Sequence, residues 1–178
     1  MHGSLIVVTG PPGAGKSTVA RELAGAFPRS ALVRGDDFFA FVSAGWVAPW
    51  LREAHTQNEV VLAAAAAAAG RFVTGGYTVV YDGVVGPWFL PAFAAATGLD
   101  ELGYAVLLPS EEQCLTRVAT RTGHGFTDAD AARQMYRQFA EAGVEERHVV
   151  RTGAAPSEIA AEILAGLDRG LFRHPGRG

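Results

Sequence analysis

Residues 10–18 read Gly-Pro-Pro-Gly-Ala-Gly-Lys-Ser-Thr and fit the pattern G-x-x-x-x-G-K-[ST] at every fixed position. Gly13 and Gly15 lack a Cβ, so the backbone can turn tightly and direct successive N–H groups at phosphate oxygens. Lys16 supplies an ammonium group for the β- and γ-phosphates, and the Ser17 hydroxyl is a hard oxygen ligand suited to Mg²⁺. The stretch therefore predicts a nucleotide-phosphate site formed by Gly10, Pro11, Pro12, Gly13, Ala14, Gly15, Lys16, Ser17 and Thr18.

The flanks of this loop favour the same interpretation over a chance glycine-rich turn. Residues 5–8 form an apolar run typical of a buried strand, and residues 17–27 fit a helix whose positive N-terminus would face the phosphates. Further apolar runs predict strands at 31–33, 77–82, 102–108 and 148–150, separated by helical patterns. At 178 residues this alternation predicts one α/β domain with a five-stranded parallel sheet.

Composition excludes several classes of protein. A net charge of −3 without a basic run disfavours a surface for nucleic acid. Cys114 is the only cysteine, which excludes an internal disulfide, and we expect a buried, inert thiol. The longest apolar run, 60–69, is too short for a membrane span, and no cationic segment marks a signal peptide. We therefore expect a cytoplasmic protein that does not bind membranes.

Acidic residues follow two of the predicted strands. Asp36 and Asp37 come after the second strand, and Asp82 ends the third. Carboxyl ends of parallel strands meet at the ligand-binding edge of an open sheet. Asp82 could hold Mg²⁺ through water, and the Gly83 that follows it is not the glutamate with which an ATP hydrolase activates water. Helix capping by Asp36 or Asp37, and a loop cap by Asp82, remain the alternatives.

Two further features concern the acceptor side and a lid. Residues 38–55 are rich in Phe and Trp, which suits either a pocket wall or packing of a loop onto the core. Arg117 and Arg121 lie four residues apart before a glycine-containing loop at 122–128, and Arg133 and Arg137 repeat the spacing after it. Such pairs fit a lid that brings positive charge to phosphates, or a solvated face with ion pairs to neighbouring acids.

In this order of features the chain resembles the small P-loop kinases, namely gluconate kinase, shikimate kinase and the chloramphenicol phosphotransferases. The stretch Arg121-Thr122-Gly123-His124-Gly125-Phe126 looks like the lid of gluconate kinase, whereas Phe39 stands where that family has a His. The resemblance implies a single-domain P-loop kinase fold over 1–168, with helices on both faces of the sheet, a lid at about 122–128 and a flexible tail at 169–178. It also implies ATP and Mg²⁺ as cofactors, with Ser17 and Asp82 as metal-binding residues.

The implied activity is transfer of a phosphoryl group from ATP to a hydroxyl of a small molecule resembling a sugar acid or an antibiotic. Lys16, Arg117 and Arg121 would act on the phosphates, and Asp37, with Asp36 as second candidate, would take the hydroxyl proton. Gly153, after the last strand, would contact adenine. The alternative classes are a nucleotide-binding regulator, a toxin-type P-loop protein and a nucleic-acid end kinase. We expect either a monomer or a homodimer.

Overall fold

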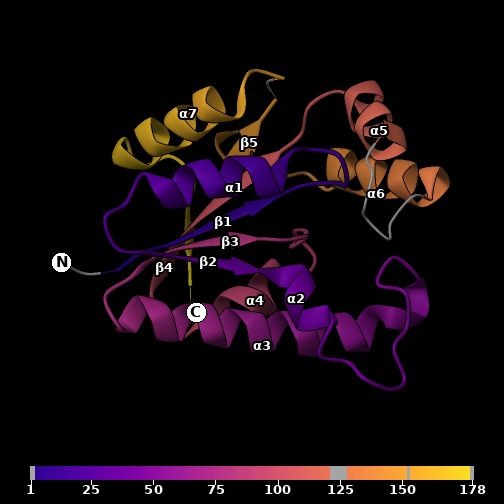
Figure 1. Cartoon of the computed structure of the whole chain (residues 1–178), viewed down its shortest axis with the longest axis horizontal. Helices are drawn as coiled ribbons and strands as arrows, with labels where there is room; N and C mark the ends of the chain where they lie inside the picture. Colours follow the sequence, from indigo (N-terminus) through magenta and orange to yellow (C-terminus); the bar gives the residue numbers. More distant parts are fainter. Residues whose placement is uncertain (1–2, 121–127, 152, 177–178) are drawn as a thin grey trace.

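The structure is a computed structural model that describes residues 3–120, 128–151 and 153–176. Its centre is a sheet in which five strands are parallel and lie in the order β2-β3-β1-β4-β5 (Figure 1). These strands are β1 (Leu5–Thr9), β2 (Ser30–Arg34), β3 (Thr78–Asp82), β4 (Glu101–Leu107) and β5 (Val149–Val150). The predicted single-domain α/β fold with a parallel sheet is confirmed.

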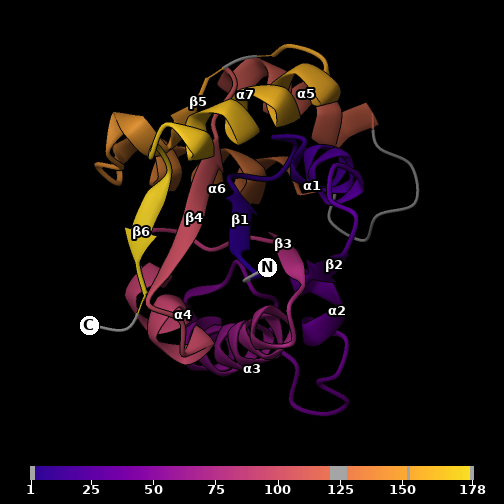
Figure 2. The same ribbon diagram turned by 90° about the vertical axis from the view of Figure 1, so that its left-hand side faces the viewer.

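Helices cover both faces of the sheet, and β1 is therefore buried on both sides. Leu5 and Val7 pack towards α3 (His55–Thr74) and α4 (Leu90–Thr97), whereas Ile6 and Val8 pack towards α1 (Lys16–Gly25) and α7 (Pro156–Asp168). Figures 1 and 2 show these two pairs of helices on opposite sides of the strands. The alternating side chains of a strand point to opposite faces, so a fully apolar strand belongs in the middle of such a sandwich.

The remaining α-helices lie close to the carboxyl ends of the strands. They are α2 (Gly35–Phe39), α5 (Glu111–Thr120) and α6 (Ala129–Glu141). Two short 3₁₀ helices also occur, η1 (Arg52–Ala54) before α3 and η2 (Glu146–His148) before β5. A capping box precedes α5, since Ser110 N–H donates to Gln113 Oε1 and Gln113 N–H donates to Ser110 Oγ, both at 3.3 Å. None of the helices in the described residues is long and apolar enough to cross a bilayer.

The expectation of a frayed tail from residue 169 is wrong for the residues that the structure describes. Residues Arg173–Pro175 form β6, which pairs antiparallel with the first half of β4, as Figure 2 shows. Phe172 is buried, and its carbonyl accepts a hydrogen bond from Tyr104 N–H at 2.7 Å. The physical reason is that Phe172 adds an apolar side chain to the core against Gly166 of α7. The sheet therefore has a sixth strand.

Candidate active site

The loop between β1 and α1 has the geometry that a phosphate-binding loop requires. Gly13 has φ 78° and Gly15, the N-cap of α1, has φ 95°, both in the left-handed region that favours glycine. A Cβ at Gly13 would collide with the backbone carbonyl of Cys114 in α5, so the loop and α5 are in close contact. Burial raises the pKa of the Cys114 thiol to about 11, which fits the expected inert cysteine.

A cavity of about 1100 Å³ opens beside this loop at the carboxyl ends of β2 and β3. Pro12, Gly13, Lys16 and Ser17 form one part of its wall. Register explains the rest: Arg34 at the end of β2 and Val8 of β1 are both partners of Asp82, so the segments after these three strands come together. A smaller adjoining cavity of about 270 Å³ is lined by Gly13, Gly15, Lys16, Ser17, Thr18, Arg117 and Thr120.

The residues expected to bind Mg²⁺ lie on the same cavity. Ser17 is half-buried and Asp82 is buried, and both line it. No group of three or more His, Cys, Asp and Glu side chains that could cage a metal occurs among the described residues. A hydroxyl and a single carboxylate nevertheless fit Mg²⁺, which is usually held by one or two protein oxygens together with phosphates and water. The donor set therefore fits this ion at a nucleotide site.

The structure separates the two acidic residues that follow β2. Asp36 lines the cavity, whereas Asp37 does not line it and is instead paired with Arg34, whose Nη2 lies 2.7 Å from Asp37 Oδ2. Of these two acids, Asp36 faces the cavity, whereas the Asp37 carboxylate points to a surface guanidinium. The capping interpretation is wrong for both: Arg34 is the N-cap of α2, and both acids lie inside its first turn.

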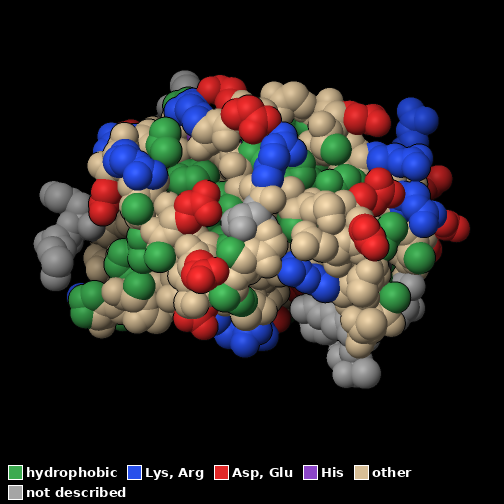
Figure 3. Space-filling view, turned by 90° about the horizontal axis from the view of Figure 1, so that it is seen from above, with side chains coloured by type: hydrophobic (Ala, Val, Ile, Leu, Met, Phe, Trp, Pro, Cys, Tyr) green, Lys and Arg blue, Asp and Glu red, His purple; other side chains and the backbone are tan. Residues whose placement is uncertain are grey.

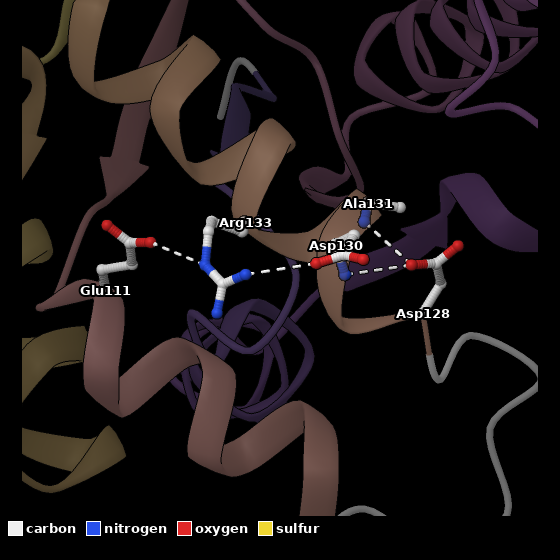
Figure 4. A network of polar contacts seen from close by, with 5 residues as sticks. All are labelled: Glu111, Asp128, Asp130, Ala131 and Arg133. Carbon is white, nitrogen blue, oxygen red and sulfur yellow. Dashed lines mark hydrogen bonds and ion pairs between the residues drawn. The ribbon is translucent and has the colours of Figure 1, made fainter.

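The arginines expected around a lid have different surroundings. Arg117 is exposed and donates from Nη1 to Gly13 O at 3.3 Å, so it lies beside the phosphate loop. Arg133 forms two ion pairs (Figure 4): its Nε lies 3.4 Å from Glu111 Oε1, and its Nη1 lies 3.2 Å from Asp130 Oδ1. These contacts confirm the ion-pair interpretation for this residue. Arg121 and positions 122–127 of the expected lid lie outside the described residues. Arg137 is exposed on α6.

Asp128, the last residue of the expected lid, caps α6. Its Oδ1 accepts hydrogen bonds from the backbone N–H groups of Asp130 at 3.0 Å and Ala131 at 2.9 Å (Figure 4). Gly153, expected at the adenine, lies after β5, where an added Cβ would be 2.6 Å from Gln113 Nε2 of α5. It lines neither the 1100 Å³ cavity nor the adjoining smaller one.

Aromatic side chains make up much of the wall opposite the phosphate loop. Phe39, Trp46 and Trp50 of the aromatic stretch line the cavity, whereas Phe38 packs against the core. Both interpretations of the stretch therefore hold, for different residues. Trp88 and Phe89 also line the cavity and were not expected there. Helix α4 begins only at Leu90, so 83–89 is a loop at the end of β3.

Two buried polar atoms on lining residues have no hydrogen-bond partner, Asn58 Oδ1 and Tyr81 Oη. The side-chain amide of Asn58 is held in place by its nitrogen, because Nδ2 donates a hydrogen bond to Pro49 O at 2.7 Å. The Tyr81 hydroxyl lies between Gly35 and Gly83, both of which line the cavity. Burial, with smaller effects of the Asp36 and Asp82 carboxylates, raises the pKa of Tyr81 well above its ordinary value. Tyr81 is therefore a protonated donor throughout the neutral range.

The face seen from above in Figure 3 carries interspersed acidic and basic side chains. A stripe of positive charge is the usual footprint of a nucleic-acid surface. Among the described side chains on this face there is no such stripe.

A parallel sheet with a G-x-x-x-x-G-K-[ST] loop between β1 and α1 is the arrangement of P-loop nucleotide-binding proteins. A family model described as an AAA domain matches residues 5–142, so the chain belongs to this family. No curated protein matches the chain by sequence.

Solved structures are similar over nearly the whole chain. The tunicamycin resistance protein of Deinococcus radiodurans matches with a TM-score of 0.70 and 16% identity, covering 97% of this chain and 99% of its own. A gluconokinase from Sinorhizobium meliloti matches with a TM-score of 0.65 and 24% identity, covering 96% of this chain and 94% of its own. A shikimate kinase from Acinetobacter baumannii, solved with shikimate, matches with a TM-score of 0.66 and 18% identity, covering 94% of each chain. At these identities the likeness establishes the fold, and the expected resemblance to small P-loop kinases is confirmed.

Proposed function

We propose that the protein is an ATP-dependent kinase that transfers the γ-phosphoryl group to a hydroxyl of a small molecule. One observation carries the proposal: a single cavity is lined by the phosphate loop on one side and by Asp36 and an aromatic wall on the other. A phosphoryl donor and an acceptor could therefore meet inside it. The kinases among the structural neighbours support phosphotransfer as the reaction class.

The phosphate side of the site would position the donor and neutralise its charge. Lys16 and the loop N–H groups would bind the β- and γ-phosphates, and Arg117 lies where it could contact them as well. Ser17 and, through water, Asp82 would hold Mg²⁺, which when bound screens the negative charge on these phosphates. Phosphoryl transfer depends mainly on such positioning and electrostatic stabilisation, since its transition state is loose.

On the acceptor side, Asp36 would orient the hydroxyl and accept its proton as the phosphoryl group is transferred. It is the carboxylate of α2 that faces the cavity, and it follows the strand that lies beside β3 and Asp82. Proton acceptance by a positioned side chain contributes about 10²–10⁴-fold to a rate. Asp37 is a matched neighbour, because it has the same chemistry and the same helix but a surface partner.

The test is ADP release from Mg·ATP, measured with a panel of sugar acids, neutral alcohols and aromatic alcohols. Asp36→Asn should lower acceptor-dependent kcat about 10²–10⁴-fold, with ATP affinity unchanged. Asp37→Asn should stay within a few-fold of the unmodified protein.

Three results would contradict the proposal or its assignments. Equal losses in both variants would mean that Asp36 has no special role. A loss only in Asp37→Asn would make Asp37 the proton acceptor instead. Tight ATP binding with no acceptor-stimulated turnover would favour a nucleotide-binding regulator over a kinase.

A further inference from the structure

The aromatic part of the cavity wall comes from three separate segments of the chain. Phe39 belongs to α2, Trp46 and Trp50 to the connection that precedes η1, and Trp88 and Phe89 to the loop after β3. His55, at the start of α3, stacks on Phe89 with ring centroids 5.1 Å apart and planes at 28°. Large planar side chains that converge from distant segments present apolar faces to whatever occupies the space between them.

Two of these aromatic residues are open to solvent. Trp46 is 50% exposed and Trp88 is 43% exposed. Their rings lie near other aromatic rings. The ring centroids of Trp46 and Trp50 are 6.4 Å apart, and those of Trp88 and Phe139 are 5.4 Å apart. Partly exposed tryptophans at a cavity mouth are typical of ligand-binding surfaces, because a bound ring removes their apolar area from water.

The described part of the cavity wall carries more acidic than basic side chains beyond the phosphate loop, which disfavours an anionic acceptor. Beyond the phosphate loop, the described lining residues include the carboxylates of Asp36, Asp82 and Glu141, the guanidinium of the exposed Arg52 and the imidazole of His55, which is paired with Glu59. An acceptor that carries a carboxylate would meet like charges near its reacting hydroxyl, which raises the cost of binding. A neutral or positively charged acceptor meets no such penalty.

Resting on the kinase function proposed above, we infer that the acceptor is an uncharged or cationic hydroxylated molecule with a flat aromatic body, and not a sugar acid. The ring lies against the tryptophan and phenylalanine faces, and the hydroxyl points to Asp36. Asn58 and Tyr81, with unpartnered polar atoms on the same wall, supply an acceptor and a donor for further polar groups if the wall adjusts around the ligand.

Three small probes that share a phenyl ring test the charge preference: phenyl glycol is neutral, phenylglycinol is cationic and mandelate is anionic. Glycerol is the matched probe without a ring. Binding is measured by calorimetry in the presence of Mg·ADP, and turnover by ADP release from Mg·ATP. We expect phenyl glycol and phenylglycinol to bind at least about tenfold more tightly than mandelate and glycerol, and to stimulate ADP release.

A pair of variants tests the wall itself. Trp46→Ala should weaken phenyl glycol binding about tenfold and leave Mg·ADP binding unchanged, because Trp46 lies away from the phosphate loop on the aromatic stretch. Phe72→Ala is the matched control, since Phe72 is similarly exposed at 45% on α3 but does not line the cavity. Equal effects of the two substitutions would overturn the assignment of the aromatic wall.

The outcomes separate this inference from the proposed function. Preferential binding and turnover of mandelate or gluconate would overturn the inference while supporting a kinase. Binding of the neutral and cationic ring probes without turnover would support the ligand class and overturn the kinase activity. Failure of both ring probes to bind better than glycerol would overturn the inference whatever the turnover.

Discussion

Two buried tyrosines provide a stability prediction that depends only on their hydroxyl groups. Both side chains are almost completely buried, but Tyr104 Oη donates to Val85 O at 2.8 Å whereas Tyr81 Oη has no partner. Removing a hydrogen-bonded hydroxyl costs about 1 kcal/mol of unfolding free energy. Removing an unpartnered buried hydroxyl relieves a desolvation penalty of about 1–3 kcal/mol. Tyr104→Phe should therefore destabilise the protein, and Tyr81→Phe should stabilise it.

The assay is thermal and urea unfolding of the two variants beside the unmodified protein. For a chain of this size, about 1 kcal/mol corresponds to a Tm shift of about 2–4 °C. We expect the Tm of Tyr104→Phe to fall by about that amount and the Tm of Tyr81→Phe to rise by at least as much. Val85 O keeps a hydrogen bond from Thr9 Oγ1 at 3.2 Å, so the loss at Tyr104 should stay small. A Tyr81→Phe variant that is less stable than Tyr104→Phe would refute the reasoning.

Three other predictions concern separate parts of the molecule. Gly13→Ala should abolish nucleotide binding by calorimetry, because φ is 78° there and the new methyl group would collide with the Cys114 carbonyl; retained binding would contradict the described loop. Burial lowers the pKa of His148 below 6.5, so the folded state resists its protonation and the free energy of unfolding should fall as pH drops below about 6.5. The His148→Gln variant should show a flatter pH dependence of this free energy in urea titrations, and an equally steep dependence would contradict the prediction. Phe172→Ala should cost about 3–5 kcal/mol in denaturant unfolding, whereas a frayed tail would leave stability unchanged.

Much of the fold could be predicted because its signals are local. The loop at 10–18, the apolar run before it and the alternation of strands with helices are each visible in a short window of sequence. Helix α4 begins only at Leu90, although Gly86 and Pro87 look like a helix start, because the chain first completes a loop. Strand β6 was missed because its pairing with β4 joins residues seventy or more positions apart, beyond any local pattern.

The candidate site was predicted in its residue types but not in its orientation. Adjacent residues in a helix point about 100° apart, so which of Asp36 and Asp37 faces the cavity depends on where α2 begins. That start is set at Gly35, and Arg34 then pairs with Asp37. The presence of Arg34 three residues before Asp37 is the sequence signal that favours Asp36. The aromatic residues of the loop after β3 had no such signal, because only the folded chain brings them opposite residues 38–55.

The sixth strand has a consequence for how the protein behaves at high concentration. β4 has two neighbours on one side, since its first half pairs with β6 and its last residues, Val106 and Leu107, pair with β5. Without β6, the backbone of Glu101–Gly103 would present unpaired N–H and C=O groups, which is the kind of edge on which another chain can add a strand. Residues 173–175 thus cover this edge of β4 and disfavour self-association. Their deletion should be detected first as aggregation.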